Sequence, residues 1–330
     1  SFRRISILLL SRLMPRRRAG PLVALGIYDG PKAAEAVLAQ AGAEAAGVVL
    51  TPPRPLVSRA AYGAAFRRVA DYIVAGDCYQ INLTFPMAAR LEAGSPLGLY
   101  GALRARQTVG YGMFCDLGAG PVVISRSPEL FFRLDGGVIV ARPMKGTAPR
   151  DADPARDAAL AAELRASAKA QAENLMIVDL LRNDIARISE VGSVKVPELY
   201  AVEAFSTVHQ MSSTVTGRLK DRVDLAGLMA ALFPCGSITG APKLRAMQLI
   251  VELEAGERGI YSGALGYLGI DGSADLGMVI RTIVFEPHGV RIGIGGGITS
   301  DSVPSDELEE TRIKAKALLE ALGLDDPWSW

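Results

Sequence analysis

The stretch Ser125–Arg150 (SRSPELFFRLDGGVIVARPMKGTAPR) constrains the fold most, because it predicts a β-hairpin. An apolar run leads into Asp135-Gly136-Gly137 and then into the apolar segment Val138–Ala141, which is the pattern of two antiparallel strands joined by a tight turn. The hairpin would bring its outer ends, Glu129 and Lys145, to the same end of a sheet. There a carboxylate and an amine can serve as general acid and nucleophile, whereas a surface salt bridge is the ordinary explanation of such a pair.

The composition allows a large core and excludes several classes of partner. The chain has 330 residues, 49% of them hydrophobic, which suffices for one large domain or two. A net charge of +1 and 6% aromatic residues do not indicate a nucleic-acid-binding surface. The apolar run Ile7–Leu10 is too short to span a bilayer, so we expect no membrane partner either.

The number and spacing of the cysteines indicate the redox state of the protein's compartment. Cys78, Cys115 and Cys235 are far apart and form no CxxC pair, which excludes a zinc ribbon or a disulfide framework. This usage indicates a reducing compartment, and we expect a cytoplasmic protein.

Secondary structure can be predicted along the rest of the chain. Residues 1–20 carry the basic cluster Arg16–Arg18 and no acidic residue, which fits a transit peptide or, as we prefer, a loose tail. The other predicted elements are a strand over Leu22–Tyr28, a helix over Lys32–Ala41, a linker at Thr51–Pro55, a helix capped by Ser58, a strand over Cys78–Leu83, a helix near Pro96–Arg106, strands around Tyr111–Asp116 and Val122–Ser125, one helix from about Pro154 to Ile188, a strand-like segment Val202–Ser213, a helix over Leu244–Glu254, a meander of Gly259–Ile270, Leu276–Phe285 and Val290–Ile298, and a helix from Pro304.

Charged residues on apolar faces mark a candidate site. Glu173 precedes Met176 and Ile177 at helical spacing, so its carboxylate would project from the apolar face and need a cation, unless it lies partly exposed at the edge. Arg281 alternates with apolar residues in the middle strand of the meander, which suits a buried anion or an edge position reaching solvent. One face of the last helix would carry Glu307, Glu310 and Lys314, as exposed helices also do.

Polar and glycine-rich segments add to this inventory. The loop Phe233–Lys243 does not fit the nucleotide P-loop pattern, although a helix N-terminus there suits a carboxylate. Gly295–Gly297 lets backbone approach a ligand closely. Gln80 and Asn82 would share a strand face that usually meets solvent, and His209 would ordinarily be a satisfied core residue.

The inventory describes a site for a small anion. Carboxylates without clustered histidine or cysteine suit Mg²⁺ rather than zinc. Together with an arginine and backbone amide donors, Mg²⁺ would bind a small polyanion.

The chain resembles the chorismate-utilising enzymes, and within that family the aminodeoxychorismate synthase component I branch. The resemblance implies an α+β fold, a sandwich of two antiparallel β-sheets with outer helices. It also implies a weakly matching N-terminal segment, residues 1–55, before a catalytic domain at 56–325, because family members commonly have a longer N-terminal region. The matching segments run in family order across about 56–320: GDCYQINL, SRSPELFF, PMKGTAPR, AENLMIVDLLRNDIARI, STVHQMSSTV, CGSITGAPKLRAMQLI, YSGALGYLG, MVIRTIVF and IGGGITSDSVPSDELEETRIKAKALL.

The resemblance implies a role for each matching residue. Glu129 would protonate the departing C4 hydroxyl of chorismate, and Lys145 would be the nucleophile. The other implied roles are Mg²⁺ binding by Glu173 and Glu310 with Glu307 nearby; binding of the enolpyruvyl carboxylate by Tyr261, Arg281 and the backbone of Gly295, Gly296 and Gly297; lining of the ring by Gly146, Thr147, Ser237 and His209; and a positive charge from Lys314.

Two positions decide the reaction that the resemblance implies. Relatives that add water to chorismate carry a lysine where this chain has Gln80, which is therefore expected to be a substrate-binding residue. Anthranilate synthases typically carry alanine at the position of Lys145. The pattern thus favours amination of chorismate at C4 to 4-amino-4-deoxychorismate, with ammonia from a separate glutamine amidotransferase subunit and a lyase consuming the product. The alternatives are anthranilate synthase component I and a non-catalytic member of the family.

Overall fold

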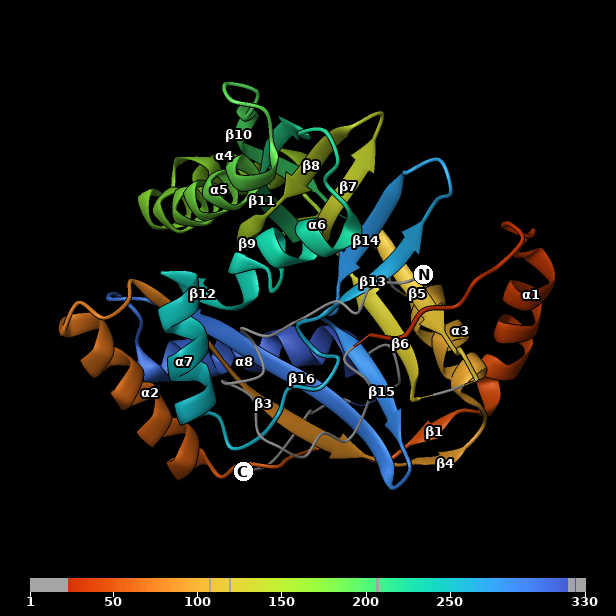
Figure 1. Ribbon diagram of the computed structural model, residues 1–330. Coiled ribbons are helices and arrows are strands. Elements are labelled where there is room, and N and C mark those ends of the chain that lie inside the picture. Colours follow the sequence, from red (N-terminus) through yellow and green to blue (C-terminus); the bar gives the residue numbers. More distant parts are fainter. Residues whose placement is uncertain (1–22, 107, 119, 206–207, 320–323, 325–330) are drawn as a thin grey trace. The chain divides into compact units, whose positions relative to one another are not determined.

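The computed structural model describes residues 23–106, 108–118, 120–205, 208–319 and 324 (Figure 1). These residues divide into two compact units. The first contains Glu129–Leu244 and Ala264–Met278, and the second contains the described residues up to Pro128, Arg245–Gly263 and the described residues from Val279 onward. The expectations for residues 1–20 fall outside the described residues.

Among the described residues, no helix combines the length and the apolar character needed to cross a membrane.

The first unit is built on an antiparallel sheet with the strand order β10-β11-β8-β7-β14-β13, and β9 also pairs with β11. Helices α4 and α5 pack against β11 and β9. The elements of this unit are β7 (Leu130–Asp135), β8 (Val138–Arg142), β9 (Met144–Pro149), α4 (Pro154–Ala166), α5 (Ala168–Ile188), β10 (Lys195–Ala204), β11 (Val208–Arg218), α6 (Leu225–Leu232), the 3₁₀ turn η2 (Gly236–Ile238), β12 (Gly240–Ala241), β13 (Ala264–Leu268) and β14 (Ala274–Met278).

The predicted hairpin is confirmed as β7 and β8. Asp135 pairs with Val138, so Gly136 and Gly137 form a two-residue turn. Both glycines have positive φ, +53° and +75°, as the tight turn between right-twisted strands requires. At the open end Leu130 pairs with Arg142, so Glu129 precedes and Lys145 follows the same end of the hairpin.

The second unit is built on another antiparallel sheet, in which β3, β16, β15, β6 and β5 are consecutive and β2 pairs with β3. A small sheet pairs β1 with β4. The elements are α1 (Glu35–Glu44), η1 (Ala45–Gly47), β1 (Val49–Leu50), β2 (Arg54–Pro55), α2 (Arg59–Val74), β3 (Gln80–Ala89), β4 (Leu91–Ala93), α3 (Pro96–Arg106), β5 (Tyr111–Cys115), β6 (Val122–Ser127), α7 (Lys243–Leu253, which begins in the first unit), β15 (Thr282–Glu286), β16 (Gly289–Ile298) and α8 (Pro304–Leu319). The α+β class with two antiparallel sheets is therefore confirmed.

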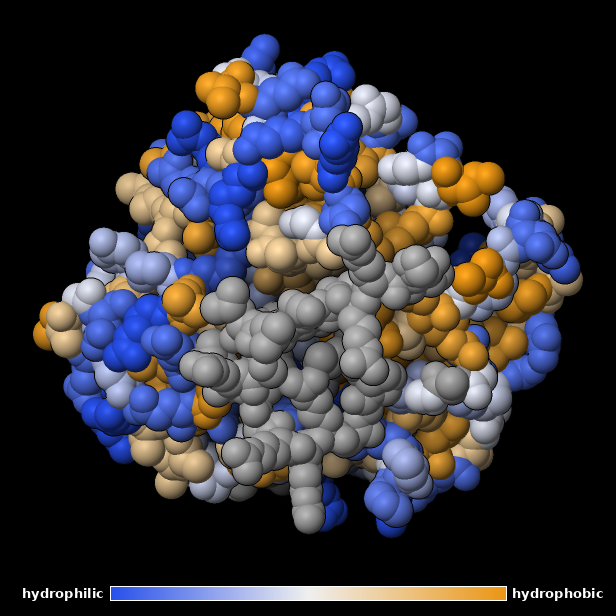
Figure 2. Space-filling view, in the orientation of Figure 1, coloured by the Kyte–Doolittle hydropathy of each residue, from blue (hydrophilic) through white to orange (hydrophobic). Residues whose placement is uncertain are grey.

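Helix α2 illustrates how the second unit is held together. Ser58 caps it as predicted, with its hydroxyl accepting a hydrogen bond from the backbone N–H of Ala61 at 3.2 Å. Tyr62 and Phe66 recur at helical spacing and are buried in the core of the sheet. The Tyr62 ring meets the ring of Phe85 on β3 edge to face, with centroids 5.5 Å apart. The surface over α2 and α7 is mainly hydrophilic (Figure 2).

The predicted meander is wrong. Its middle segment is two strands in different sheets: β14 ends at Met278 in the first unit, and β15 begins at Thr282 in the second. Arg281 lies in the connection, half-buried and at φ +49°, so it is not a buried guanidinium in the middle of a strand. The largely apolar sequence of residues 278–285 runs through the connection without a break, so periodicity alone cannot detect the change of sheet.

Other predicted boundaries also differ. The helix from Pro154 to Ile188 is broken at Ser167, whose extended backbone and hydroxyl cap the second helix through the N–H of Ala170. Residues 202–204 belong to β10 and residues 208–213 to β11, and these two strands pair antiparallel. Residues 23–28, the described part of a predicted strand, form no strand, and α1 continues through Gly42.

Candidate functional site

The predicted general acid lies beside the loop that carries Ser237. Glu129 is buried directly before β7, and its backbone carbonyl accepts a hydrogen bond from the N–H of Met278 at 3.0 Å. Burial is the largest cause, and the negative charge of Glu129 the second, that raise the pKa of Cys235 to about 11. Cys235 is therefore a neutral thiol. The Cys235 sulfur lies 3.3 Å from the hydroxyl of Ser237. The first unit thus brings Glu129, Cys235 and Ser237 together, although the sequence argument assigned no role to Cys235.

Strand β9 carries three predicted site residues. Met144 pairs with Ser212 of β11 and Thr147 with Gln210, which places half-buried Lys145 on a paired strand. Gly146 has φ +83°, and a Cβ added there would lie 2.9 Å from Cβ of Ala170. Helix α5 therefore packs directly on the backbone beside Lys145, and no side chain fits at Gly146 without strain.

Glu173 lies at the edge of the apolar stripe of α5. Its side chain is 26% exposed, and its carboxylate lies 4.0 Å from the amine of Lys169 one turn earlier. Its neighbours Ile177 and Leu181 are fully buried. The amine of exposed Lys169 therefore supplies part of the positive charge expected near Glu173. Exposed ion pairs of this kind contribute little to stability.

His209 on β11 is only 3% exposed. Its Nε2 lies 2.8 Å from a carboxylate oxygen of Asp157 at the start of α4. Its Nδ1 is buried and has no hydrogen-bond partner among the described residues. The ordinary interpretation of His209 as a satisfied core residue therefore holds for one ring nitrogen and not for the other.

In the second unit, α8 places its charged residues against β16. A Cβ added to Gly296 would lie 3.4 Å from a carboxylate oxygen of Glu307 and 3.7 Å from the amine of Lys314. Glu307 is buried and accepts a hydrogen bond from the hydroxyl of Ser302 at 2.6 Å. Glu310 is exposed and pairs with Lys314 at 2.7 Å. The helix face predicted from the spacing therefore exists and lies along the glycine segment.

Two further predicted residues of this unit are buried in strands. Gln80 and Asn82 on β3 do not face solvent, contrary to the usual behaviour of such a pair. Both polar atoms of the Gln80 amide lack a hydrogen-bond partner among the described residues. A buried amide without partners is unfavourable, so this position suits a polar ligand.

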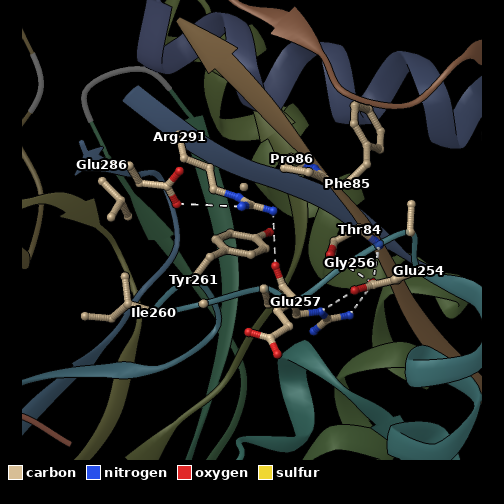
Figure 3. Close-up of a pocket in the computed structure, with 15 residues that line it drawn as sticks. Thr84, Phe85, Pro86, Glu254, Gly256, Glu257, Ile260, Tyr261, Glu286 and Arg291 are labelled. Carbon is tan, nitrogen blue, oxygen red and sulfur yellow. Dashed lines mark hydrogen bonds and ion pairs between the residues drawn. The ribbon is translucent and has the colours of Figure 1, made fainter. Parts of the chain in front are cut away.

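Tyr261 lines a pocket of the second unit, shown in Figure 3. Burial is the main cause that raises the pKa of Tyr261 to about 12, so the phenol keeps its proton and can donate a hydrogen bond. Glu254 accepts hydrogen bonds from the N–H of Thr84 at 2.8 Å and from Arg258 at 2.6 Å. Arg258 also donates to the carbonyl of Asn82 at 2.7 Å. This partly buried pair of Glu254 and Arg258 fixes the loop that carries Tyr261 to strand β3.

The chemistry of the donor set fits Mg²⁺. The predicted ligands Glu173, Glu307 and Glu310 offer only carboxylate oxygens, which a hard divalent cation prefers. Glu307 is already held by Ser302, which orients one of its oxygens. Within the part of the chain that the structure describes, no group of three or more His, Cys, Asp or Glu residues lies close enough to hold a metal ion by itself.

Comparison with known proteins identifies the family of this chain and several relatives. Residues 32–320 match the family model described as chorismate binding enzyme. The chain is 44% identical over 302 residues to aminodeoxychorismate synthase component 1 of Klebsiella aerogenes, covering 91% of this chain and 66% of that protein. It is 44% identical over 255 residues to anthranilate synthase component 1 of Streptomyces coelicolor, covering 77% of this chain and 50% of that protein.

A comparison with solved structures also finds a relative of this chain. Anthranilate synthase component I from Streptococcus pneumoniae superposes with a TM-score of 0.75 at 34% identity, over 83% of this chain and 60% of that one. The chain thus spans about half to two thirds of the length of these relatives. The match to the family model covers most of the sequence, and the chain belongs to the chorismate binding enzyme family.

Proposed function

We propose that this chain aminates chorismate at C4 to give 4-amino-4-deoxychorismate. Lys145 in the PMKGT segment carries the proposal, because anthranilate synthases typically have alanine there. Glu129 lies directly before β7 and Lys145 lies on β9, so both residues adjoin the open end of the β7–β8 hairpin. This placement supports a joint role for the two residues. Residues 56–325 form the proposed catalytic domain.

The first proposed step forms a bond between Lys145 and the substrate. The neutral amine attacks C2 of chorismate, both ring double bonds shift by one position, and the C4 hydroxyl leaves. Glu129 donates the proton with which the hydroxyl departs as water. Lys145 remains attached to C2 as a secondary ammonium, and Glu129 is left as a carboxylate.

The second step releases the lysine. Ammonia attacks C4, both ring double bonds shift back, and Lys145 leaves C2 as a neutral amine. The new C4 ammonium gives one proton to the Glu129 carboxylate, which restores both groups. Two successive displacements explain amination with retention of configuration, and the sum of the steps is chorismate plus ammonia giving 4-amino-4-deoxychorismate plus water.

The other residues bind and orient the substrate in this proposal. Glu173 and Glu310, with Glu307 nearby, would hold Mg²⁺, which would supply positive charge for the ring carboxylate. The enolpyruvyl carboxylate is bound by Tyr261, Arg281 and the backbone of Gly295, Gly296 and Gly297. The ring is lined by Gln80, Gly146, Thr147, Ser237 and His209, and Lys314 adds positive charge.

Ammonia comes from a separate glutamine amidotransferase subunit in this proposal, and a lyase takes the product. Two relatives support this because they bear the name component 1. The neutral thiol of Cys235 also argues against a glutaminase nucleophile at that position, since the reactive form of cysteine is the thiolate.

The second candidate function is that of anthranilate synthase component I. The relative from Streptomyces coelicolor favours it, because it is as similar in identity as the relative from Klebsiella aerogenes.

An assay with chorismate, Mg²⁺ and ammonium separates the two functions. We expect chorismate to be consumed without anthranilate fluorescence, and p-aminobenzoate to form once an aminodeoxychorismate lyase is added. Anthranilate as the main product would refute the proposal. Absence of any chorismate turnover by the intact chain, with or without a glutaminase subunit, would favour a non-catalytic member of the family.

Glu173→Gln and Glu310→Gln are each expected to abolish activity at limiting Mg²⁺ and to leave the circular dichroism spectrum unchanged. Each removes a charged metal ligand from a position at least a quarter exposed, so the core is not affected. Glu309→Gln is the matched control, because Glu309 is exposed and lies on α8 beside Glu310. This variant should keep full activity. Wild-type Mg²⁺ dependence in either ligand variant would remove that residue from the metal site.

A further inference from the structure

His209 and Asp157 form a dyad whose geometry fixes the proton on the imidazole. Asp157 lies in the first turn of α4, and its carboxylate oxygen is 2.8 Å from Nε2 of His209 on β11. These residues are 52 positions apart in the chain. The contact therefore depends on α4 packing against β11.

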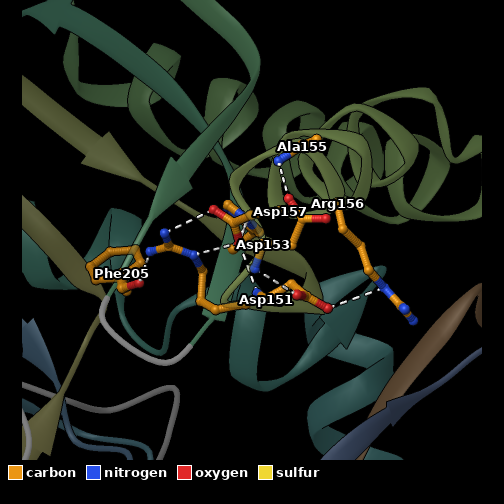
Figure 4. Close-up of polar contacts among 8 residues, drawn as sticks. Asp151, Asp153, Ala155, Arg156, Asp157 and Phe205 are labelled. Carbon is orange, nitrogen blue, oxygen red and sulfur yellow. Dashed lines mark hydrogen bonds and ion pairs between the residues drawn. The ribbon is translucent and has the colours of Figure 1, made fainter.

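Asp157 is held as an anion by neighbours other than His209. Arg150 makes two parallel contacts with its carboxylate, each 2.8 Å long, and the N–H of Asp151 donates to it at 3.0 Å (Figure 4). The hydrogen bond from Arg150 is the largest cause that holds the pKa of Asp157 well below its usual range. Arg150 also donates to the carbonyl of Phe205, which ties the start of α4 to the end of the hairpin strand before His209.

A carboxylate anion can only accept hydrogen bonds, so Nε2 of His209 must carry the hydrogen. In the neutral ring the lone pair is then on Nδ1. Nδ1 is buried and unpartnered among the described residues, and a buried acceptor without a donor is unfavourable. The site is therefore complete only when a group with an N–H or O–H donor meets Nδ1.

We propose that Asp157, braced by Arg150, is a positioning residue that holds His209 in the Nε2–H tautomer and presents the Nδ1 lone pair to a donor of the reaction. This inference rests on the proposed function, in which His209 lines the chorismate ring. The donor is either the ring hydroxyl of chorismate or the incoming ammonia, and both have the same hydrogen-bonding chemistry.

Nitrogen NMR of the whole chain labelled on histidine rings tests the tautomer without any substrate. The sequence has only two histidines, and exposed His288 serves as the internal reference. In its neutral imidazole form we expect His209 to show a protonated Nε2 and an unprotonated Nδ1. Asp157→Asn should populate the other tautomer, because the amide can donate to Nε2, and Asp157→Glu should restore the wild-type pattern. A protonated Nδ1 in the wild type, or an unchanged tautomer in Asp157→Asn, would overturn the inference.

Ligand additions and kinetics test the role in the reaction. A shift of the Nδ1 resonance with chorismate alone identifies the hydroxyl as the donor, and a shift with ammonium alone identifies ammonia. No shift with either would overturn the assignment of Nδ1 to a ligand. Asp157→Asn should lower kcat on the order of 10²-fold with little change in KM, and Asp157→Glu should recover part of it. Unchanged kcat in Asp157→Asn would overturn the positioning role.

Asp275→Asn is the matched control. Asp275 pairs with Arg133 in the same unit at 2.8 Å, and its side chain is 18% exposed against 16% for Asp157, but it has no histidine partner. We expect wild-type kcat and tautomer for this variant. Arg150→Lys keeps the positive charge and loses the two parallel contacts, so it should give an intermediate effect if Asp157→Asn does not fold. A protein that turns over no chorismate but shows the tautomer change would refute the proposed function and leave the dyad assignment standing.

Discussion

Lys145→Ala and Lys145→Arg are both expected to lose C4 amination by at least about 10³-fold, because the nucleophile of the first step is gone. Arginine keeps the positive charge but is essentially never deprotonated, so it cannot attack C2. Lys145 is half-buried on β9 next to Gly146, and its replacement leaves the packing of Gly146 on α5 unchanged. The measurement is chorismate consumption with ammonium and Mg²⁺, beside circular dichroism.

Mass spectrometry gives the direct test of the covalent step. The wild-type protein, quenched after reaction with chorismate and Mg²⁺ without ammonia, should carry a chorismate-derived adduct on Lys145. Lys195→Arg, at an exposed lysine of β10 in the same unit, is the control and should keep both the adduct and the activity. A fully active Lys145→Arg would reduce Lys145 to an electrostatic role and remove the best argument for 4-amino-4-deoxychorismate over anthranilate.

Features with a local cause could be predicted from the sequence. The turn between β7 and β8 needs positive φ at two successive residues, and Gly136-Gly137 is one of the few kinds of pair that favour it. Helix α2 combines the Ser58 cap with Tyr62 and Phe66 at helical spacing, so its start and its buried face follow directly. The face shared by Glu307, Glu310 and Lys314 was also predictable, since helical spacing fixes it before any tertiary contact is known.

Features that depend on distant contacts could not be predicted in this way. The residue pattern over 279–285 does not distinguish one continuous strand from a connection between two sheets. Arg281 was therefore placed wrongly. Asp157 gave no signal because its partner His209 is brought to it only by the packing of α4 on β11. Cys235 stands two residues before Ser237, yet its neighbour Glu129 is more than 100 residues away in the chain.

Gly295→Ala is expected to destabilise the second unit by about 3 kcal/mol, the upper part of the range for overpacking. A Cβ at this position would collide with the carbonyl oxygen of Leu83 and lie 2.7 Å from Cα of Thr84, both on β3. These are backbone atoms of a strand paired with β16 along its length, so they cannot turn away as a flexible side chain would. The glycine is therefore required by the sheet itself, in addition to any approach of its backbone to a ligand.

Gly63→Ala provides the matched comparison, because Gly63 lies within α2 of the same unit. A Cβ there would meet only the end of the flexible Arg67 side chain at 3.6 Å. Alanine forms helix better than glycine, so this variant should gain up to about 1 kcal/mol. Urea unfolding followed by circular dichroism measures both variants. Equal stability of Gly295→Ala and the wild type would mean that β3 and β16 separate at little cost, and the close packing of these strands would then not explain why glycine is needed at position 295.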